Sequence, residues 1–122
     1  VADEALMDTV TAVSGSGPAY LFLLAEAMQA AAEAQGLPPA AARMLTLQTM
    51  HGAARMLLDS GEDAATLRQR VTSPDGTTQA ALESFEACGF REVVARAIAA
   101  ATRRGGELSA ANDPLPAAKP AP

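Results

Sequence analysis

Apolar residues recur along most of the chain at three- and four-residue steps, the spacing of one face of an α-helix. The pattern and its bounding residues predict five main helices, at about residues 18–35, 40–60, 63–71, 78–87 and 91–104. Gly36, Gly61 and Gly89 each follow a predicted helix, where glycine readily takes the left-handed conformation that closes a helix. The expected fold class is therefore all-α, a bundle of about five helices.

Several helix starts also have a local signal. Asp63 is expected to cap the third helix, because a side-chain oxygen there can accept a free N–H of the first turn. The run Ser14–Pro18 predicts a break followed by a new start, with Ser16 as the cap and Pro18 in the first turn. The opening segment, residues 3–10, is too short to distinguish a short helix from an extended lead-in.

Two of the helices are expected to bury an apolar stripe in the core. In the second helix, this stripe consists of Met44, Leu47, Met50, Ala54, Leu57 and Leu58. That of the fifth consists of Val93, Val94, Ala97, Ile98 and Ala101, and Arg103 and Arg104 are expected at the negative C-terminal end of this helix.

The first long helix differs, because residues 19–25 (Ala-Tyr-Leu-Phe-Leu-Leu-Ala) are apolar on every side. A helix without a polar face has to be covered all round. It is either the central helix of a compact bundle or is covered by a second subunit. We favour the second subunit, because a small domain leaves much of its surface exposed.

The composition further narrows the class of protein to which this chain can belong. Apolar residues make up 49% of the 122 residues but aromatic residues only 3%, which fits closely approaching alanine-rich helices. A net charge of −5 without a basic cluster argues against nucleic-acid binding, and no segment is long and apolar enough for a membrane span. The single cysteine excludes an intrachain disulfide framework and favours the cytoplasm. After Gly105–Gly106 the chain becomes rich in alanine and proline, and residues 110–122 are expected to form a disordered tail.

Conventional catalytic groups are few. His51 is the only histidine, so no histidine cluster can bind a metal, and packing is its expected role. Cys88 is expected to be a small buried residue rather than a nucleophile. Gly15-Ser16-Gly17 lacks the third glycine and the preceding strand of a dinucleotide-binding turn, so we reject that interpretation.

The best candidate for a binding site is the segment Thr72-Ser73-Pro74-Asp75-Gly76-Thr77-Thr78. It places hydroxyl groups and free backbone N–H groups at the start of a helix, where a carboxylate or phosphate can bind. The alternative is an ordinary turn with Thr77 as the helix cap. On spacing alone, the ordinary turn is favoured.

Two of these segments together resemble a known family. Residues 10–20 (Val-Thr-Ala-Val-Ser-Gly-Ser-Gly-Pro-Ala-Tyr) and residues 67–86, centred on Val71–Thr78, are similar to motifs of pyrroline-5-carboxylate reductase in its C-terminal domain. Gly89-Phe90-Arg91 and Glu107-Leu108 also match, so the resemblance covers about residues 3–109.

The resemblance implies a fold, a reaction and partners. Members of the family reduce 1-pyrroline-5-carboxylate to L-proline with NADPH or NADH, and their helical domains interlock in a homodimer that can assemble into a larger ring. It implies that residues 1–109 form the dimerisation and substrate-binding domain and that the N-terminal dinucleotide-binding domain is absent from this chain. The isolated chain is then expected to be inactive.

The resemblance also implies roles for single residues. Ser73, Gly76, Thr77 and Thr78 would bind the substrate carboxylate, Thr78 would also act in catalysis near the ring nitrogen, and Thr11 would lie near the nicotinamide. The expected ligands are a small-molecule substrate and the cofactor, with no metal, nucleic acid or membrane.

Two positions depart from the family pattern. Asp75 stands where members have glycine, and its charge would weaken carboxylate binding unless it points to solvent; aspartate can nevertheless adopt a positive φ. Ala64 replaces a frequent proline, which affects only rigidity. Because of Asp75, a second hypothesis stays open: a stand-alone helical dimerisation module without reductase activity.

Overall fold

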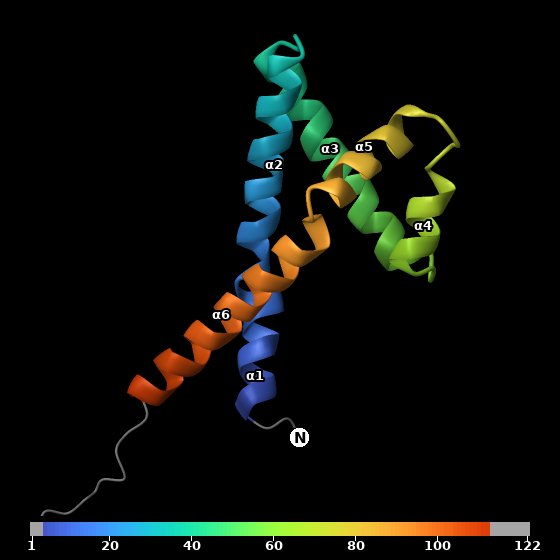
Figure 1. Ribbon diagram of the computed structural model, residues 1–122. Helices are drawn as coiled ribbons and strands as arrows, with labels where there is room; N and C mark the ends of the chain where they lie inside the picture. The colour runs from blue at the N-terminus through green and yellow to red at the C-terminus, as the bar shows by residue number, and fades with distance from the viewer. Residues whose placement is uncertain (1–3, 113–122) are drawn as a thin grey trace, which may run out of the picture. The chain divides into compact units, whose positions relative to one another are not determined.

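The computed structural model describes residues 4–112, and over that range it is helical without any strand. The elements are α1 (Glu4–Val10), a π-helical segment η1 (Thr11–Gly15), α2 (Gly17–Ala34), α3 (Pro39–Asp59), α4 (Ala64–Arg70), α5 (Thr77–Ala87) and α6 (Phe90–Asn112). The all-α fold and the five main helices are confirmed, and the opening segment is a short helix (Figure 1).

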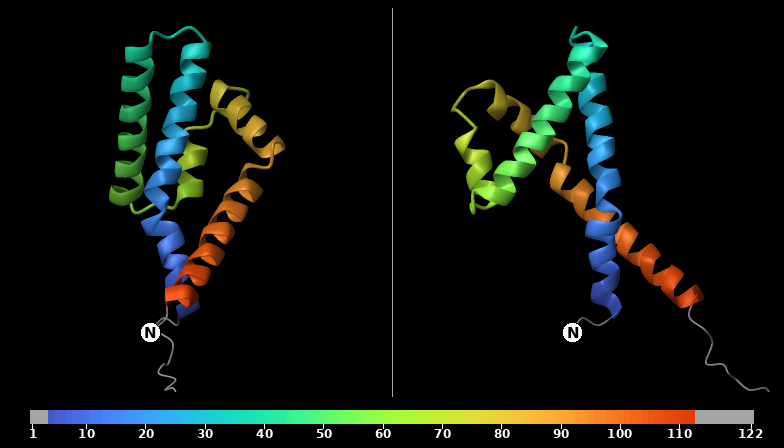
Figure 2. Two further views of the ribbon diagram at one scale, coloured as in Figure 1. Left: turned by 90° about the vertical axis from the view of Figure 1, so that its left-hand side faces the viewer. Right: turned by 180° about the vertical axis from the view of Figure 1, so that it is seen from behind.

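The described residues divide into two compact units, one of residues 19–90 and one that combines the residues up to 18 with those from 91 onward. In the first unit, α2 and α3 lie side by side and antiparallel, joined by a short turn (Figures 1 and 2). Helices α4 and α5 follow α3 and are joined by the segment singled out in the sequence. The second unit contains α1, η1 and α6.

The predicted glycine closures are confirmed. Gly36, Gly61 and Gly89 all have positive φ, at 109°, 75° and 78°. After α2, the N–H of Leu37 donates to the carbonyl of Ala32 (3.1 Å) and that of Gly36 to Glu33 (2.9 Å). This pair of bonds satisfies carbonyls at the helix end that would otherwise lack partners.

Asp63 caps α4 as predicted, because its carboxylate accepts the backbone N–H of Thr66 at 2.8 Å. This backbone hydrogen bond, together with the one from the Thr66 hydroxyl, lowers the pKa of Asp63 below its ordinary value of 3.8. The stabilisation from the charged cap is therefore fully present above pH 3.8 and is lost as the pH falls through the lowered pKa.

We expect Asp63→Ala to lower the melting temperature at pH 7, with a deficit that shrinks as the pH falls below about 3.8. Asp63→Asn is the matched control, because an amide oxygen still caps the helix but does not titrate. Thermal unfolding followed by circular dichroism from pH 7 to pH 3 measures both. If the loss of melting temperature in Asp63→Ala stays constant with pH, the assignment of Asp63 as a charged cap is wrong.

The break expected at Ser14–Pro18 is confirmed, although it is short: η1 ends at Gly15, Ser16 lies in neither helix, and α2 begins at Gly17 with Pro18 in its first turn. A π-helical turn continues α1 up to this break, with the Ser16 N–H donating to the Thr11 carbonyl at 2.9 Å. The cap expected at Ser16 is wrong. Ser16 has helical φ and ψ of −86° and −20°, not the extended conformation of an N-cap. The Ser14 hydroxyl donates to the Val10 carbonyl (2.9 Å), so this serine supports the helix it was expected to interrupt.

The end expected for the last helix is also wrong, since α6 continues through Gly105–Gly106 to Asn112. At these glycines α6 passes close to α1: a Cβ on Gly105 or Gly106 would lie 3.5 or 3.4 Å from the carboxylate oxygens of Asp8. The glycines therefore serve close helix packing rather than a helix end. Arg103 and Arg104 consequently lie inside the helix, where Arg104 pairs with Glu107 at 3.0 Å. Of the predicted tail, residues 113–122 lie outside the described residues.

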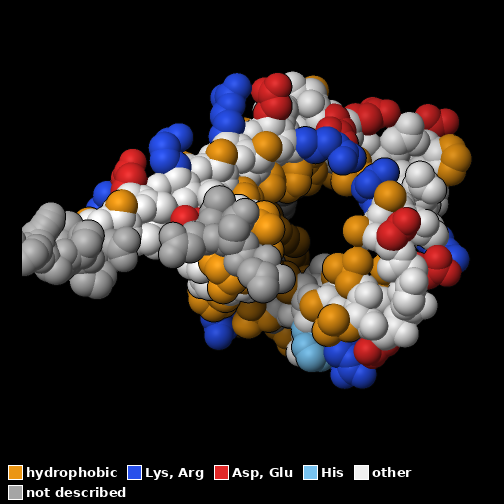
Figure 3. All heavy atoms as spheres, turned by 90° about the horizontal axis from the view of Figure 1, so that it is seen from below, with side chains coloured by type: hydrophobic (Ala, Val, Ile, Leu, Met, Phe, Trp, Pro, Cys, Tyr) orange, Lys and Arg blue, Asp and Glu red, His pale blue; other side chains and the backbone are white. Residues whose placement is uncertain are grey.

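The buried core within this chain is small. The buried residues are Ala12, Ala25, Ala42, Thr46 and Leu67. Both predicted stripes are wrong for the single chain, since Leu58 is 80% exposed and Val93 58%. Figure 3 shows apolar side chains open to solvent on the face seen from below. Among the described residues, no helix is long and apolar enough to cross a membrane.

Candidate functional site

The segment between α4 and α5 is tied to the end of α4 by short-range hydrogen bonds. The hydroxyl of Thr72 donates to the carbonyl of Arg68, and the N–H of Thr72 donates to the carbonyl of Gln69 at 3.1 Å. Thr72 is half-buried, whereas Ser73 after it is exposed. The chain therefore leaves α4 in a fixed direction before it turns into α5.

Asp75 has a φ of 61°, the one positive value at a non-glycine residue of the described chain. This confirms that aspartate takes the turn conformation that the family pattern assigns to glycine. Its side chain is exposed. Its N–H donates to the side-chain oxygen of Gln79 at 2.6 Å, a bond that sequence reasoning did not anticipate.

Gly76 closes the turn and directly precedes α5. Its N–H donates to the carbonyl of Ser73 at 3.1 Å, and a Cβ at Gly76 would lie 3.2 Å from that same oxygen. A side chain at this position would therefore push the Ser73 carbonyl away. Gly76, with extended backbone, is the N-cap residue, so the interpretation of Thr77 as the cap is wrong.

The first turn of α5 presents free donors. Helix geometry leaves the N–H groups of Thr77, Thr78 and Gln79 without partners inside the helix, and no acidic side chain lies in this first turn. Thr77 is exposed and Thr78 is half-buried. The structure thus brings Ser73, Gly76, Thr77 and Thr78 together at the positive end of a helix dipole, an arrangement that can hold a carboxylate.

Thr11, the fifth predicted site residue, belongs to the other unit and is no part of this turn. It is exposed and begins the π-helical segment. Its methyl group faces Gly15, where an added Cβ would approach it to 3.3 Å. Single π-helical turns are frequent at functional sites because they re-aim side chains.

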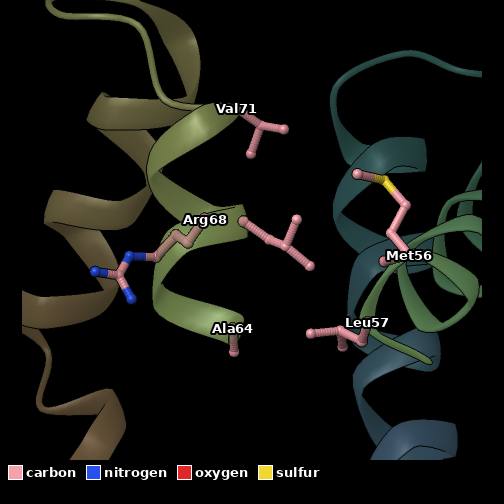
Figure 4. A pocket seen from close by; sticks show the side chains of 7 residues that line it. Met56, Leu57, Ala64, Arg68 and Val71 are labelled. Carbon is pink, nitrogen blue, oxygen red and sulfur yellow. The ribbon is translucent and has the colours of Figure 1, made fainter. Parts of the chain in front are cut away.

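Two hollows flank α4. One of about 450 Å³ between α4 and α5 is lined by Arg68, Gln69, Thr72, Gln79, Leu82, Glu83 and Glu86. The other, about 250 Å³ between α3 and α4, is almost wholly apolar. Figure 4 shows the guanidinium of Arg68 directed away from Met56 and Leu57. The carboxylates of Glu83 and Glu86 make the α4–α5 hollow poorly suited to an anion.

The remaining chemical candidates are exposed. Cys88, expected to be buried, is a free exposed thiol at the end of α5. His51, for which packing was expected, is exposed on α3. Among residues 4–112 no group of histidine, cysteine and acidic side chains is placed to bind a metal ion. The expectations for Cys88 and His51 both assumed that the single chain buries a larger core than it does.

Comparison with known proteins identifies the family. The family described as pyrroline-5-carboxylate reductase dimerisation matches residues 4–108. Pyrroline-5-carboxylate reductase of Pseudomonas aeruginosa is 57% identical over 107 residues, which are 88% of this chain and 39% of that protein. The Arabidopsis thaliana reductase is 45% identical over 108 residues, again 88% of this chain and 39% of the relative.

Comparison with solved structures identifies the same family. The chain matches a pyrroline-5-carboxylate reductase of Coxiella burnetii with a TM-score of 0.85 and 47% identity, covering 88% of this chain and 40% of that one. It matches the Plasmodium falciparum enzyme, solved with NADP bound, with a TM-score of 0.81 and 35% identity over 85% of this chain and 40% of that one. The chain spans about two fifths of the length of these relatives. It therefore belongs to the pyrroline-5-carboxylate reductase family and corresponds to the dimerisation part of its members.

Proposed function

We propose that this chain is the dimerisation and substrate-binding part of a pyrroline-5-carboxylate reductase, which reduces 1-pyrroline-5-carboxylate to L-proline in proline biosynthesis. The observation that carries the proposal is the turn at the start of α5, where Ser73, Gly76, Thr77 and Thr78 converge without an acidic neighbour in the first helical turn. The substrate carboxylate would accept hydrogen bonds from the hydroxyl groups of this turn and from the N–H groups of Thr77 and Thr78, whereas Gly76, whose N–H donates to the Ser73 carbonyl, would shape the turn.

The proposed role of each group depends on the charge of the substrate atoms that it would contact. The N–H groups at the helix start neutralise the carboxylate and fix one end of the substrate ring. The hydroxyl of half-buried Thr78 then faces the ring nitrogen, where it orients the imine and helps to deliver the proton that the nitrogen gains. NADPH or NADH would supply the hydride to the imine carbon, so the protein contributes position and electrostatics.

The described residues could contact only one end of such a cofactor. Gly15 and Gly17 lie in helical segments rather than in a phosphate-binding turn after a strand, so they cannot cradle a pyrophosphate. Thr11, which is exposed, would contact the nicotinamide end. The rest of the cofactor site would be supplied by a dinucleotide-binding domain.

The partner that we propose is a second copy of the chain, in a homodimer that could assemble into larger rings. Leu21, Phe22 and Leu23 of α2 are all more than half exposed, although water is a poor environment for them. A second copy can cover this face, and the family match is to a dimerisation domain. We assign residues 1–109 to this domain and, from the single free cysteine, the protein to the cytoplasm.

The alternative of a stand-alone dimerisation module depended on Asp75, and the geometry now weakens it. Asp75 preserves the turn with its φ of 61°, and its exposed side chain can leave the carboxylate position to the N–H groups. The departure from glycine is thus compatible with substrate binding.

The test joins this chain to the remaining part of the Pseudomonas aeruginosa reductase and follows NADPH oxidation with 1-pyrroline-5-carboxylate. We expect substrate-dependent oxidation and L-proline as the product. The matched control is the Pseudomonas protein with its own C-terminal part. A folded, dimeric joined protein without turnover, beside an active control, would favour the stand-alone module.

A further inference from the structure

We propose that Gln79 is a positioning residue for the carboxylate turn: it holds Asp75 in the left-handed conformation and thereby keeps the donors at the start of α5 in place. The inference rests on the proposed function, because it concerns the same turn. It adds a residue to that turn and explains how this chain tolerates aspartate where the family pattern has glycine.

The geometry links Gln79 to the backbone on one side and to α5 on the other. Its side-chain oxygen accepts the N–H of Asp75 at 2.6 Å, and its side-chain nitrogen donates to a carboxylate oxygen of Glu83 at 3.0 Å. Glu83 lies one turn further along the same helix, so it fixes which end of the amide faces the turn. Gln79 therefore presents an acceptor to Asp75 and not a donor.

The third helical residue often reaches back in this way to the N–H of the N-cap residue. Here the Gly76 N–H is already bound to the Ser73 carbonyl, and Gln79 reaches one residue further, to Asp75. The two bonds hold consecutive peptide groups. Together they fix the path from Ser73 to Thr78, which contains every proposed carboxylate-binding residue.

A restraint at Asp75 matters because an L-residue pays an energetic cost at positive φ that glycine does not. Without the bond to Gln79, Asp75 would relax toward negative φ and rotate the peptide groups that precede α5. A neutral amide is also the suitable acceptor here. A carboxylate at position 79 would place a negative charge in the first helical turn, where the substrate carboxylate is proposed to bind.

The experiment measures KM and kcat for 1-pyrroline-5-carboxylate in the joined reductase. We expect Gln79→Leu to raise KM by roughly five- to tenfold with kcat nearly unchanged, since binding of the carboxylate weakens equally in ground and transition states. In an Asp75→Gly background the same substitution should change KM less than about twofold, because glycine holds the turn unaided. Gln48→Leu, at an exposed glutamine of α3, is the matched control and should change neither constant.

Amide hydrogen exchange at Asp75, measured by NMR in the chain itself, gives a readout independent of turnover. We expect protection in the unsubstituted chain and its loss in Gln79→Leu. An equal rise of KM in both backgrounds, or loss of protection with unchanged KM, would overturn the positioning role. If the unsubstituted joined protein reduces no substrate, the proposed function itself fails, and the role of Gln79 in substrate binding fails with it.

Discussion

Phe22→Asp is expected to convert the chain from a dimer into a monomer at micromolar concentration. Phe22 is 69% exposed on α2, between Leu21 and Leu23, within the run of residues 19–25 that is apolar on every side. If a second copy covers this face, a carboxylate there would be buried without a partner, at a cost of several kcal/mol. The dissociation constant should rise by at least roughly a hundredfold. Light scattering over a range of concentrations measures the change.

Gln35→Asp, one residue past the end of α2, is the control for the added charge, and it should remain dimeric. Complete loss of helicity in Phe22→Asp would also agree with a core that only the partner completes, because Leu67 is the largest buried residue in the described part of the single chain. If the unsubstituted chain is monomeric at these concentrations, or if Phe22→Asp is as dimeric as Gln35→Asp, the proposed interface is wrong.

Thr78→Ala is expected to lower kcat of the joined reductase by about a hundredfold, within the usual contribution of a positioned proton-transfer group. Thr78 is half-buried in the first turn of α5. Loss of its hydroxyl would remove the group that is proposed to orient the imine. The helix itself should persist, because alanine is a good helix former.

Thr78→Ser keeps the hydroxyl and is expected to retain most of the turnover. Thr77→Ala provides a second comparison, because Thr77 is proposed to contact the carboxylate alone and its loss should act mainly on KM. Steady-state kinetics with 1-pyrroline-5-carboxylate separate the two effects, and circular dichroism checks the fold. Unchanged kcat in Thr78→Ala would remove this residue from the mechanism.

The local features of this fold were predictable from short sequence patterns. Gly36 follows the last periodic residue of α2 and ends that helix with positive φ. Asp63 precedes α4 and caps it. These features depend on residues within about one helical turn of each other, and the sequence contains that information directly.

The same local rules failed where distant segments meet. Gly105–Gly106 has the signature of a helix end, yet α6 continues because these glycines admit the side chain of Asp8 from α1. At Ser14–Pro18 the predicted break is present but short, because a π-helical turn carries the chain as far as Gly15 and α2 begins at Gly17. At Gly105–Gly106 packing outweighs a glycine penalty of about 1 kcal/mol per residue.

For the site, the sequence alone determined which residues gather at the start of α5, because Ser73, Gly76, Thr77 and Thr78 lie within six consecutive positions. Only the tertiary structure decided how they are held: Gly76 rather than Thr77 is the N-cap residue, Asp75 takes positive φ, and Gln79 accepts its N–H. It also decided that the apolar stripes of α3 and α6 stay exposed within one chain. Periodicity identifies an apolar face, but whether the same chain or a partner covers that face depends on how the helices pack in three dimensions.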